Sequence, residues 1–244
     1  MQSPIRDRPP IETDRALTLL SHGDVELRGR MPYSSNATFL VDVAHDGLEA
    51  QAIYKPVRGE RHLWDFPPGL AHREAGAFVV DAALGWNVVP PTVVRQDLPF
   101  DEGSLQLFMP AHFEEHYFTL AEQPGLRSEL ERICALDIVI NNTDRKSGHC
   151  LLGTDGTVWA IDNGLSFHRE FKLRTVIWDF AGEELPADVR GDLGRLLDDG
   201  LPEQLADTLT QPEHDATMAR TETLLASGRF PIDGHGHRWP WPLV

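Results

Sequence analysis

The chain has 244 residues, of which 22 are basic and 38 are acidic, so its formal net charge is −16 at pH 7. A surface with this charge repels nucleic acids and anionic membranes, which argues against a nucleic-acid partner. The two cysteines, Cys134 and Cys150, lack the spacing of a disulfide or zinc motif and indicate reduced thiols. Neither the apolar run of a signal peptide nor a segment long enough to cross a membrane is present, so we expect a soluble, cytoplasmic protein.

The first half of the chain has the residue pattern of β-strands, interrupted by one predicted helix. Three early prolines indicate a loose N-terminal arm, which we assign to residues 1–20. Apolar residues at helical spacing predict a helix over residues 70–84, and Asp46–Gly47 predicts a hairpin turn. The strands are predicted over residues 24–31, 37–43, 48–56, 88–94 and 104–110.

The second half of the chain is mainly helical by its pattern. The segment "RSELERICALDIVI", residues 127–140, is the strongest helix candidate. Residues 149–162 predict a short hairpin that turns at Asp155–Gly156. Two further helices are predicted over residues 187–200 and 215–228, because each segment has helical periodicity and ends on glycine.

Two acidic residues stand at the ends of neighbouring predicted elements. Asp144 lies in the polar turn after the helix of residues 127–140, and Asp162 follows the hairpin. Such a pair suits phosphoryl transfer, in which one carboxylate orients or deprotonates an attacking hydroxyl and the other holds Mg²⁺. Farther upstream, Lys55 ends a predicted strand and Glu74 lies in the next helix, as in the ion pair by which kinases grip nucleotide phosphates.

The residues resemble the phosphatidylinositol 3-/4-kinase-like family, and the nearest resemblance is to type II phosphatidylinositol 4-kinases and their bacterial relatives. Five blocks carry the likeness in the family's order: "YKP" at 54–56, "REAGAFVVDAALGWNVVPPT" at 73–92, "SLQLFM" at 104–109, "LDIVINNTDR" at 136–145 and "AIDNGLSF" at 160–167. The resemblance implies an α+β, two-lobed protein-kinase-like fold. A β-rich N-lobe would span residues 21–109 and a helical C-lobe residues 110–244, with ATP between them.

The resemblance also implies roles for individual residues. Asp144 would be the catalytic aspartate, and Asp162 would hold the metal. Lys146 stands two residues after Asp144, where serine/threonine protein kinases have a lysine; it either steadies the moving phosphoryl group or is an exposed lysine of the turn. Lys55 would contact the α/β-phosphates of ATP while Glu74 holds Lys55. The nucleotide would further meet a phosphate-covering turn and an adenine-contacting linker, which correspond to Ser34, Ser35 and Asn36 and to Leu107, Phe108 and Met109.

The chain departs from the family pattern at two places. His149 stands five residues after Asp144, where the family usually has an asparagine that binds a second magnesium ion. Imidazole suits manganese or zinc better than magnesium, so we expect His149 near the metal, with Mg²⁺ or else Mn²⁺ as the cofactor. The alternatives are that His149 contacts the substrate or is only paired with a neighbouring carboxylate. The turn "YSSNATF" also lacks glycine. The alternative to an enzyme is therefore a degenerate kinase-like protein that binds nucleotide or acts as a scaffold.

The phosphoryl acceptor is left open by the sequence. The family points to a phosphoinositide, but the acidic charge and the missing cysteine-rich palmitoylated insert favour a protein or a soluble metabolite. Transfer of AMP instead of phosphate is a further alternative. The sequence makes no prediction of the oligomeric state.

Two basic or histidine-bearing segments add further hypotheses. The segment "HREFKLR", residues 168–174, either attracts an acidic or phosphorylated acceptor or pairs with Glu183 and Glu184. In the tail, His235 and His237 could bind a metal, but we expect instead that its two tryptophans pack the tail onto the helical part.

Overall fold

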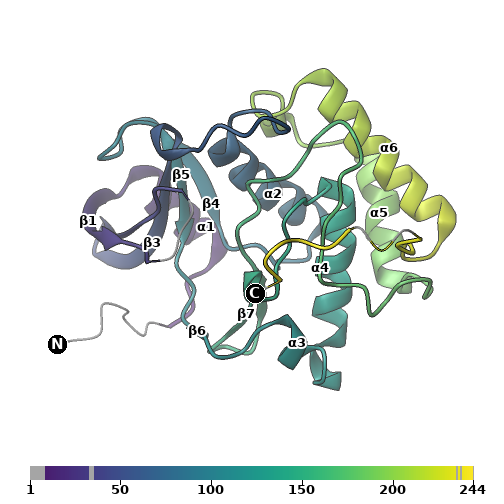
Figure 1. Cartoon of the computed structure of the whole chain (residues 1–244). Coiled ribbons are helices and arrows are strands. Elements are labelled where there is room, and N and C mark those ends of the chain that lie inside the picture. Colours follow the sequence, from purple (N-terminus) through teal and green to yellow (C-terminus); the bar gives the residue numbers. More distant parts are fainter. Residues whose placement is uncertain (1–8, 33–35, 235, 237, 244) are drawn as a thin grey trace.

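The computed structural model of the chain describes residues 9–32, 36–234, 236 and 238–243. These residues form an antiparallel sheet on one side and a largely helical part on the other (Figure 1). This arrangement confirms the predicted α+β class. Within the described ranges, no helix combines the length and the apolar character that crossing a membrane requires.

The large sheet has five strands in the order β1-β2-β3-β5-β4, and all neighbours are antiparallel. β2 and β3 form the predicted hairpin around Asp46 and Gly47. The predicted strand over residues 88–94 begins later, at Thr92, because two prolines precede it and have no N–H to donate to a neighbouring strand. The strand bounds are β1 (Asp24–Arg30), β2 (Phe39–His45), β3 (Leu48–Pro56), β4 (Thr92–Arg95) and β5 (Gly103–Leu107).

The alternation of side chains along β3 gives the sheet two different faces. Ala52 and Tyr54 pack in an apolar layer on one face, whereas Ile53 and Lys55 line a cleft on the other. A shift of the pairing by one residue would turn Lys55 away from the cleft. The sheet register therefore determines where this lysine points.

Helix α1 (Thr13–His22) covers the apolar face of the sheet, and the sequence analysis predicted no element there. Its buried side chains Ala16, Leu19 and Leu20 recur at helical spacing and pack against β2, β3, β4 and β5. The assignment of residues 13–20 to a loose arm is therefore wrong, because these three side chains are part of the core.

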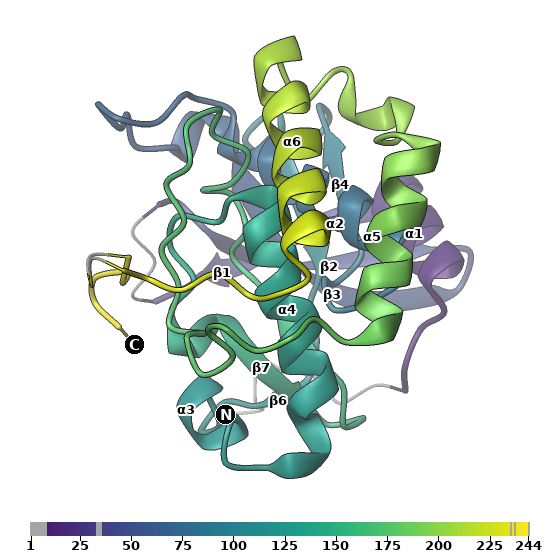
Figure 2. The same cartoon turned by 90° about the vertical axis from the view of Figure 1, so that its right-hand side faces the viewer.

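The helical part is built around α4 (Arg127–Ile140), which is buried along most of its length. Figure 2 shows α4, α5 (Ala187–Asp199) and α6 (Gln211–Ser227) lying beside one another, in agreement with their contacts. Helix α2 (Leu70–Leu84) packs on β4 and β5 and also on α4 and α5. α2 therefore joins the sheet to the helical part.

The predicted helices agree with the observed ones except at one end. α6 begins four residues earlier than the predicted position 215, because Thr210 and Glu213 form a capping box at its N-terminus. The predicted hairpin over residues 149–162 is present as β7 (Cys150–Gly153) and β8 (Val158–Ala160), which with β6 (Ala111–His112) form a small sheet. The remaining elements are short: α3 (Tyr117–Leu120), η1 (Val57–Gly59), η2 (Pro124–Leu126), η3 (Ser147–His149) and η4 (Glu203–Leu205).

Candidate active site

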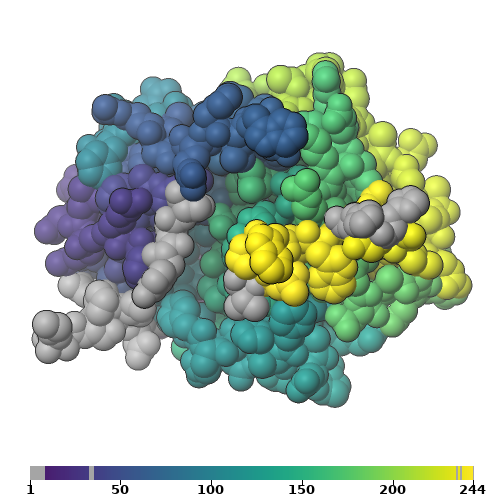
Figure 3. Space-filling view, viewed as in Figure 1, coloured from purple at the N-terminus to yellow at the C-terminus, as the bar shows by residue number. Residues whose placement is uncertain are grey.

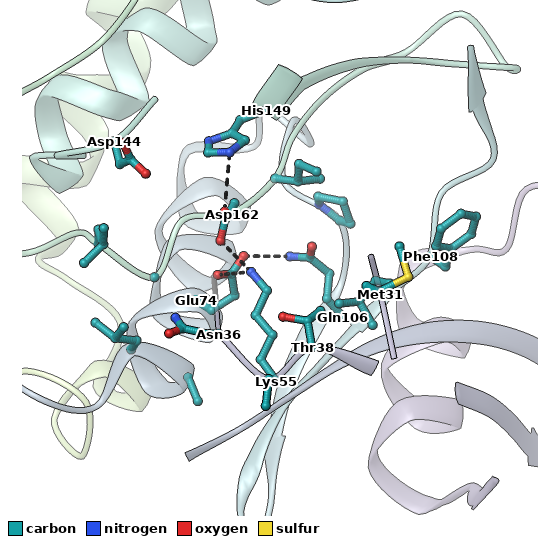
Figure 4. A pocket seen from close by; sticks show the side chains of 18 of the residues that line it. Met31, Asn36, Thr38, Lys55, Glu74, Gln106, Phe108, Asp144, His149 and Asp162 are labelled. Atoms are coloured by element: carbon teal, nitrogen blue, oxygen red, sulfur yellow. Dashed lines mark hydrogen bonds and ion pairs between the residues drawn. The ribbon is translucent and has the colours of Figure 1, made fainter. Parts of the chain in front are cut away.

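A cleft of about 670 Å³ lies between the large sheet and the helical part, and polar groups from both sides line it (Figure 4). Ser34 and Ser35, expected in the phosphate-covering turn, lie outside the described residues. The other predicted site residues all line this cleft: Asn36, Lys55, Glu74, Leu107, Phe108, Met109, Asp144, Lys146, His149 and Asp162. Asn36 and Asp162, which are 126 positions apart in the chain, are thus brought to one place. Their individual roles stay predictions.

Lys55 lies between two carboxylates. Its Nζ is 2.8 Å from Glu74 Oε2 on α2 and 2.8 Å from Asp162 Oδ1 (Figure 4). Burial alone would lower the pKa of Lys55, but the charges of Asp162 and Glu74 outweigh burial and raise this pKa above its ordinary value. Lys55 is therefore a fixed positive charge in the cleft.

Glu74 also connects three elements by hydrogen bonds. Its Oε1 accepts the backbone N–H of Asn163 at 3.0 Å and lies 3.4 Å from the side-chain nitrogen of Gln106 on β5. The side chain of Glu74 is about 1% exposed, and a buried carboxylate needs such partners to remain charged. The sequence analysis did not predict the contribution of Gln106 or Asn163.

Asp162 has a half-exposed carboxylate and an unusual backbone conformation. Its φ is 59°, in the left-handed region that non-glycine residues seldom adopt, and such strain is concentrated at functional sites. The ammonium group of Lys55, opposed by burial, lowers the pKa of Asp162 far below its ordinary value. The carboxylate is therefore ionised and open to the cleft.

The turn after α4 holds Asp144 and Lys146 on the side of the cleft opposite the strand that carries Lys55. α4 ends at Ile140 and is capped by Asn141, whose φ of 55° reverses the chain, and the side chain of Asn142 accepts the backbone N–H of Asp144 at 2.9 Å. Lys146 Nζ lies 3.0 Å from Asp144 Oδ2. Burial raises the pKa of Asp144 although Lys146 opposes the shift.

A buried arginine, Arg145, links this turn to the loop that carries Asp162. Its side chain is fully buried and forms a bidentate pair with Asp137 of α4, with nitrogen–oxygen distances of 2.9 and 3.0 Å. It also donates to the Ile161 carbonyl at 2.7 Å and to Asn163 Oδ1 at 2.5 Å. The sequence analysis missed this role, although an acid inside the apolar run "ICALDIVI" requires a partner and could have indicated it.

His149 lies at the end of η3 and points toward Asp162. Its Nε2 is 3.4 Å from Asp162 Oδ2, and its Nδ1 is 3.4 Å from the backbone nitrogen of Lys146, which donates to it (Figure 4). Burial lowers the pKa of His149 to about 4, although Asp162 opposes the shift. The imidazole is consequently neutral at pH 7.

The donor set of the cleft fits a nucleotide-bound magnesium ion only in part. The ionised, half-exposed Asp162 supplies the oxygen ligand that Mg²⁺ prefers, and Mg²⁺ commonly takes its other ligands from phosphates and water. Among the described residues, no group of three or more His, Cys, Asp or Glu side chains could hold a metal by itself. His149 offers nitrogen, which does not fit magnesium.

The basic segment of residues 168–174 does not form the ion pairs that one hypothesis assigned to it. Glu183 pairs with Arg127 and Glu184 with Arg229. Lys172 Nζ instead donates to the Asp65 carbonyl at 2.8 Å. The alternative pairing with Glu183 and Glu184 is therefore wrong, and the exposed Arg169 and Arg174 remain available on this surface.

The tail, residues 238–243, crosses the surface beside the cleft and is drawn in yellow in Figure 3. Its backbone is fixed by hydrogen bonds from the Ser147 N–H to the Leu243 carbonyl, 2.8 Å, and from the Thr175 N–H to the Arg238 carbonyl, 3.1 Å. Trp239 and Trp241 are 41% and 88% exposed, so the prediction that the tryptophans pack the tail onto the protein is wrong. His235 and His237 lie outside the described residues.

Comparison with known proteins gives independent matches in sequence. The sequence model of the family "Phosphatidylinositol 3- and 4-kinase" matches residues 78–207, a range that contains Asp144, His149 and Asp162 but not Lys55 or Glu74. Protein Rv2133c of Mycobacterium tuberculosis is 36% identical to the chain and covers 92% of it and 94% of its own length.

Solved structures also resemble the chain in fold. A structure of hydra Fam20 with sugar covers 88% of this chain and 87% of its own, with a TM-score of 0.61 at 14% identity. The Helicobacter pylori proinflammatory kinase CtkA covers 86% and 94%, with a TM-score of 0.52 at 9% identity. At these identities the likeness concerns the fold, which is kinase-like in both neighbours.

Proposed function

Because this chain belongs to the phosphatidylinositol 3- and 4-kinase family, we propose that it transfers the γ-phosphoryl group of ATP to a hydroxyl acceptor. The family and the kinase-like fold support a phosphotransferase in general. One observation carries the finer proposal: Lys55 lies 2.8 Å from both Glu74 and Asp162, in a cleft that also holds Asp144 and Lys146.

The nucleotide would lie across the cleft with its phosphates near Lys55. The ammonium group of Lys55 neutralises phosphate charge, and Glu74 keeps that group in place. Mg²⁺ bound with the phosphates would reduce their charge further, with Asp162 as its protein ligand. Asn36 also lines the cleft and would face the phosphates, whereas Leu107, Phe108 and Met109 would form an apolar wall for adenine.

Asp144 is the proposed group that receives the proton of the acceptor. As the acceptor oxygen bonds to the γ-phosphorus, its proton passes to the Asp144 carboxylate and the bond from phosphorus to the bridging oxygen breaks, which releases ADP. Burial makes Asp144 a better proton acceptor than an exposed aspartate. Lys146 Nζ, 3.0 Å from Asp144 Oδ2, would place a positive charge beside the phosphoryl group as it is transferred.

The acceptor is proposed to carry an acidic or phosphorylated group. Arg169 and Arg174 are exposed on the segment after Asp162, and within the described part of the chain neither makes an ion pair. A protein, a soluble metabolite and a phosphoinositide can all present such a group. The basic surface attracts this group locally although the whole protein has a charge of −16.

The decisive experiment is label transfer from ATP into a fractionated lysate. The protein is incubated with γ-labelled ATP and magnesium, and label is followed in the lipid, protein and small-molecule fractions. A parallel reaction with α-labelled ATP detects transfer of AMP. Label from γ-labelled ATP alone supports the proposal, whereas label from α-labelled ATP would show nucleotidyl transfer instead.

Asp144→Asn provides the first test of the assigned residues. We expect turnover to fall ~10²- to 10⁴-fold, because the variant loses the general base, while ATP affinity stays near normal. Asp155→Asn, the same chemical change on the exposed β7–β8 turn, is the matched control and keeps full turnover. Full turnover of Asp144→Asn would refute the assignment of Asp144.

His149 favours a second candidate function, a degenerate kinase that binds nucleotide without turnover. Its imidazole lies beside Asp162, where an oxygen ligand was expected. Calorimetry with ATP and magnesium, repeated with manganese, separates the candidates when it is combined with the label-transfer assay. Metal-dependent binding with no transfer supports the degenerate kinase, and no binding with either metal supports a scaffold.

A further inference from the structure

The two ring nitrogens of His149 have different partners. The imidazole is mostly buried, with 15% of its side chain exposed. Nδ1 accepts the backbone N–H of Lys146 at 3.4 Å, and Nε2 faces Asp162 Oδ2 at the same distance. A ring nitrogen that accepts a hydrogen bond carries no proton, and the ring proton is then on the other nitrogen. Because Nδ1 uses its lone pair to accept, the proton is on Nε2.

This protonation state conflicts with metal binding through His149. A metal would take the lone pair of the nitrogen that faces the cleft, namely Nε2, which the proton occupies. Moving the proton to Nδ1 would place it against the N–H of Lys146, so that two donors would face one another. The arrangement instead presents an N–H group to the ionised Asp162 carboxylate.

The positive charges around the carboxylates also argue against a second cation. Lys55 Nζ is 2.8 Å from Asp162, and Lys146 Nζ is 3.0 Å from Asp144. Two ammonium groups therefore already accompany the carboxylates that would attract a second cation. A second divalent ion would meet this positive charge and would bind only where an additional oxygen ligand offset the repulsion, which the N–H of His149 does not provide.

We propose that His149 is a positioning residue that donates its Nε2–H to Asp162, and that the cleft holds one divalent cation with the nucleotide, not two. Lys55 contacts Oδ1 of Asp162 and His149 faces Oδ2, so the carboxylate is held from two directions (Figure 4), and the cation would bind a remaining lone pair of one of these oxygens. The number of cations rests on the proposed function. The hydrogen-bonding role of His149 does not, because it concerns the protein alone.

The first test observes the imidazole in the protein without metal or nucleotide. The protein is labelled with ¹⁵N-histidine, and the His149 ring signals are identified by their loss in His149→Asn. We expect the nitrogen shifts of a protonated Nε2 and an unprotonated Nδ1, with the Nε2 proton protected from exchange with water. A protonated Nδ1 would overturn the positioning role.

The second test counts cations with Mn²⁺, which accepts imidazole more readily than Mg²⁺ and so gives His149 the best chance to bind. Mn²⁺ is titrated by electron paramagnetic resonance in the presence of a non-hydrolysable ATP analogue. We expect one bound ion in the wild-type protein and in His112→Asn, a control at an exposed histidine outside the cleft. We expect two in His149→Asn, because the carboxamide offers an oxygen ligand.

The outcomes separate this proposal from the proposed function. Two ions in the wild-type protein, or a magnetic coupling between Mn²⁺ and an imidazole nitrogen, would overturn the single-cation site. A single ion in His149→Asn would refute the claim that the imidazole excludes the second one. If neither nucleotide nor metal binds, the proposed function fails together with the cation count, while the nitrogen shifts still decide the role of His149.

Discussion

Arg145 shows how much a single buried residue determines in this site. Its guanidinium group contacts Asp137, the Ile161 carbonyl and Asn163, so it connects the helix before Asp144 with the loop of Asp162. A bidentate arginine–carboxylate pair fixes both distance and orientation. Arg145 therefore sets the relative position of the two aspartates without contacting the cleft.

Replacing Arg145 with methionine should destabilise the protein strongly. Asp137 would remain buried without a charged partner, with the Asn142 amide donating to it at 3.1 Å, and losing the charged partner of a buried pair typically costs about 3–5 kcal/mol. Urea denaturation measures the free energy of unfolding, and the exposed Arg174→Met provides the matched control. The double variant Asp137→Leu with Arg145→Met should recover part of the loss. A cost of Arg145→Met below ~1 kcal/mol would contradict this account.

Asp81 makes the stability of the folded protein depend on pH. Asp81 is buried on α2 and accepts the backbone N–H groups of Val88 and Val89 at 3.3 and 3.0 Å. Burial raises its pKa from 3.8 to about 7. Between these values the folded protein holds a proton that the unfolded chain has lost. The stabilisation by this proton is complete below the unfolded pKa and disappears as the pH rises through about 7.

Asp81→Asn should therefore remove part of the pH dependence of stability. Wild-type protein is expected to lose on the order of 2 kcal/mol more than the variant between about pH 5 and pH 7.5. Urea midpoints at both pH values measure the difference, and the exposed Asp199→Asn is the control. Equal pH dependence of wild type and Asp81→Asn would show that Asp81 titrates normally.

Among the helices and strands, α1 is the largest difference between the predicted fold and the observed one. It completes the apolar layer behind the strands that carry Lys55 and Leu107, and so supports the nucleotide side of the cleft from behind. Its neighbour β3 presents apolar residues to α1 and Lys55 to the cleft because successive side chains alternate. A helix far from the cleft thus stabilises the strand that orients Lys55.

Leu19→Ala tests the contribution of α1. Leu19 is about 1% exposed, and removing its side chain should cost about 2–5 kcal/mol through lost burial and the cavity left behind. Arg15→Ala, on the exposed side of the same helix, should change stability by less than about 0.5 kcal/mol. Thermal or urea unfolding of both variants makes the comparison. Similar losses would mean that α1 does not pack as described.

The cleft involves the whole molecule, because its lining comes from the segment between β1 and β2, from β3, α2 and β5, and from the segments after α4. A ligand in the cleft would contact the sheet and the helical part together. The exact limits of the proposed lobes, 21–109 and 110–244, stay a prediction, and α2 packs against both parts. Ligand binding should therefore stabilise the complete fold and not one portion of it.

Thermal unfolding with and without ATP and magnesium tests this expectation. At a ligand concentration 100 times the dissociation constant, the stabilisation should be about 2.7 kcal/mol. Asp162→Asn should show much less of this effect, because it removes the carboxylate that would hold the cation. A wild-type transition that splits into two steps with ligand would contradict a single cooperative response.

The predictions from sequence succeeded where local patterns and a family resemblance were informative. The family and the kinase-like fold are confirmed. Lys55, Glu74, Asp144 and Asp162 were named from local blocks, and they line one cleft. Helix α1 was missed because its four apolar residues, Ala16, Leu17, Leu19 and Leu20, form one short segment close to the early prolines that indicated an arm. Arg145 was missed because a surface arginine and a buried one look alike in sequence.

The sequence by itself determined most of the helices and strands, the acidic balance and the kinds of residue available for phosphoryl transfer, because helical period, strand alternation and charge are local properties. Only the tertiary structure decided which atoms face one another. It placed Lys55 between Glu74 and Asp162, buried Arg145 against Asp137 and turned Nε2 of His149 toward Asp162. These relations depend on the register of β3 and on the packing of α2 and α4, which join segments distant in the chain.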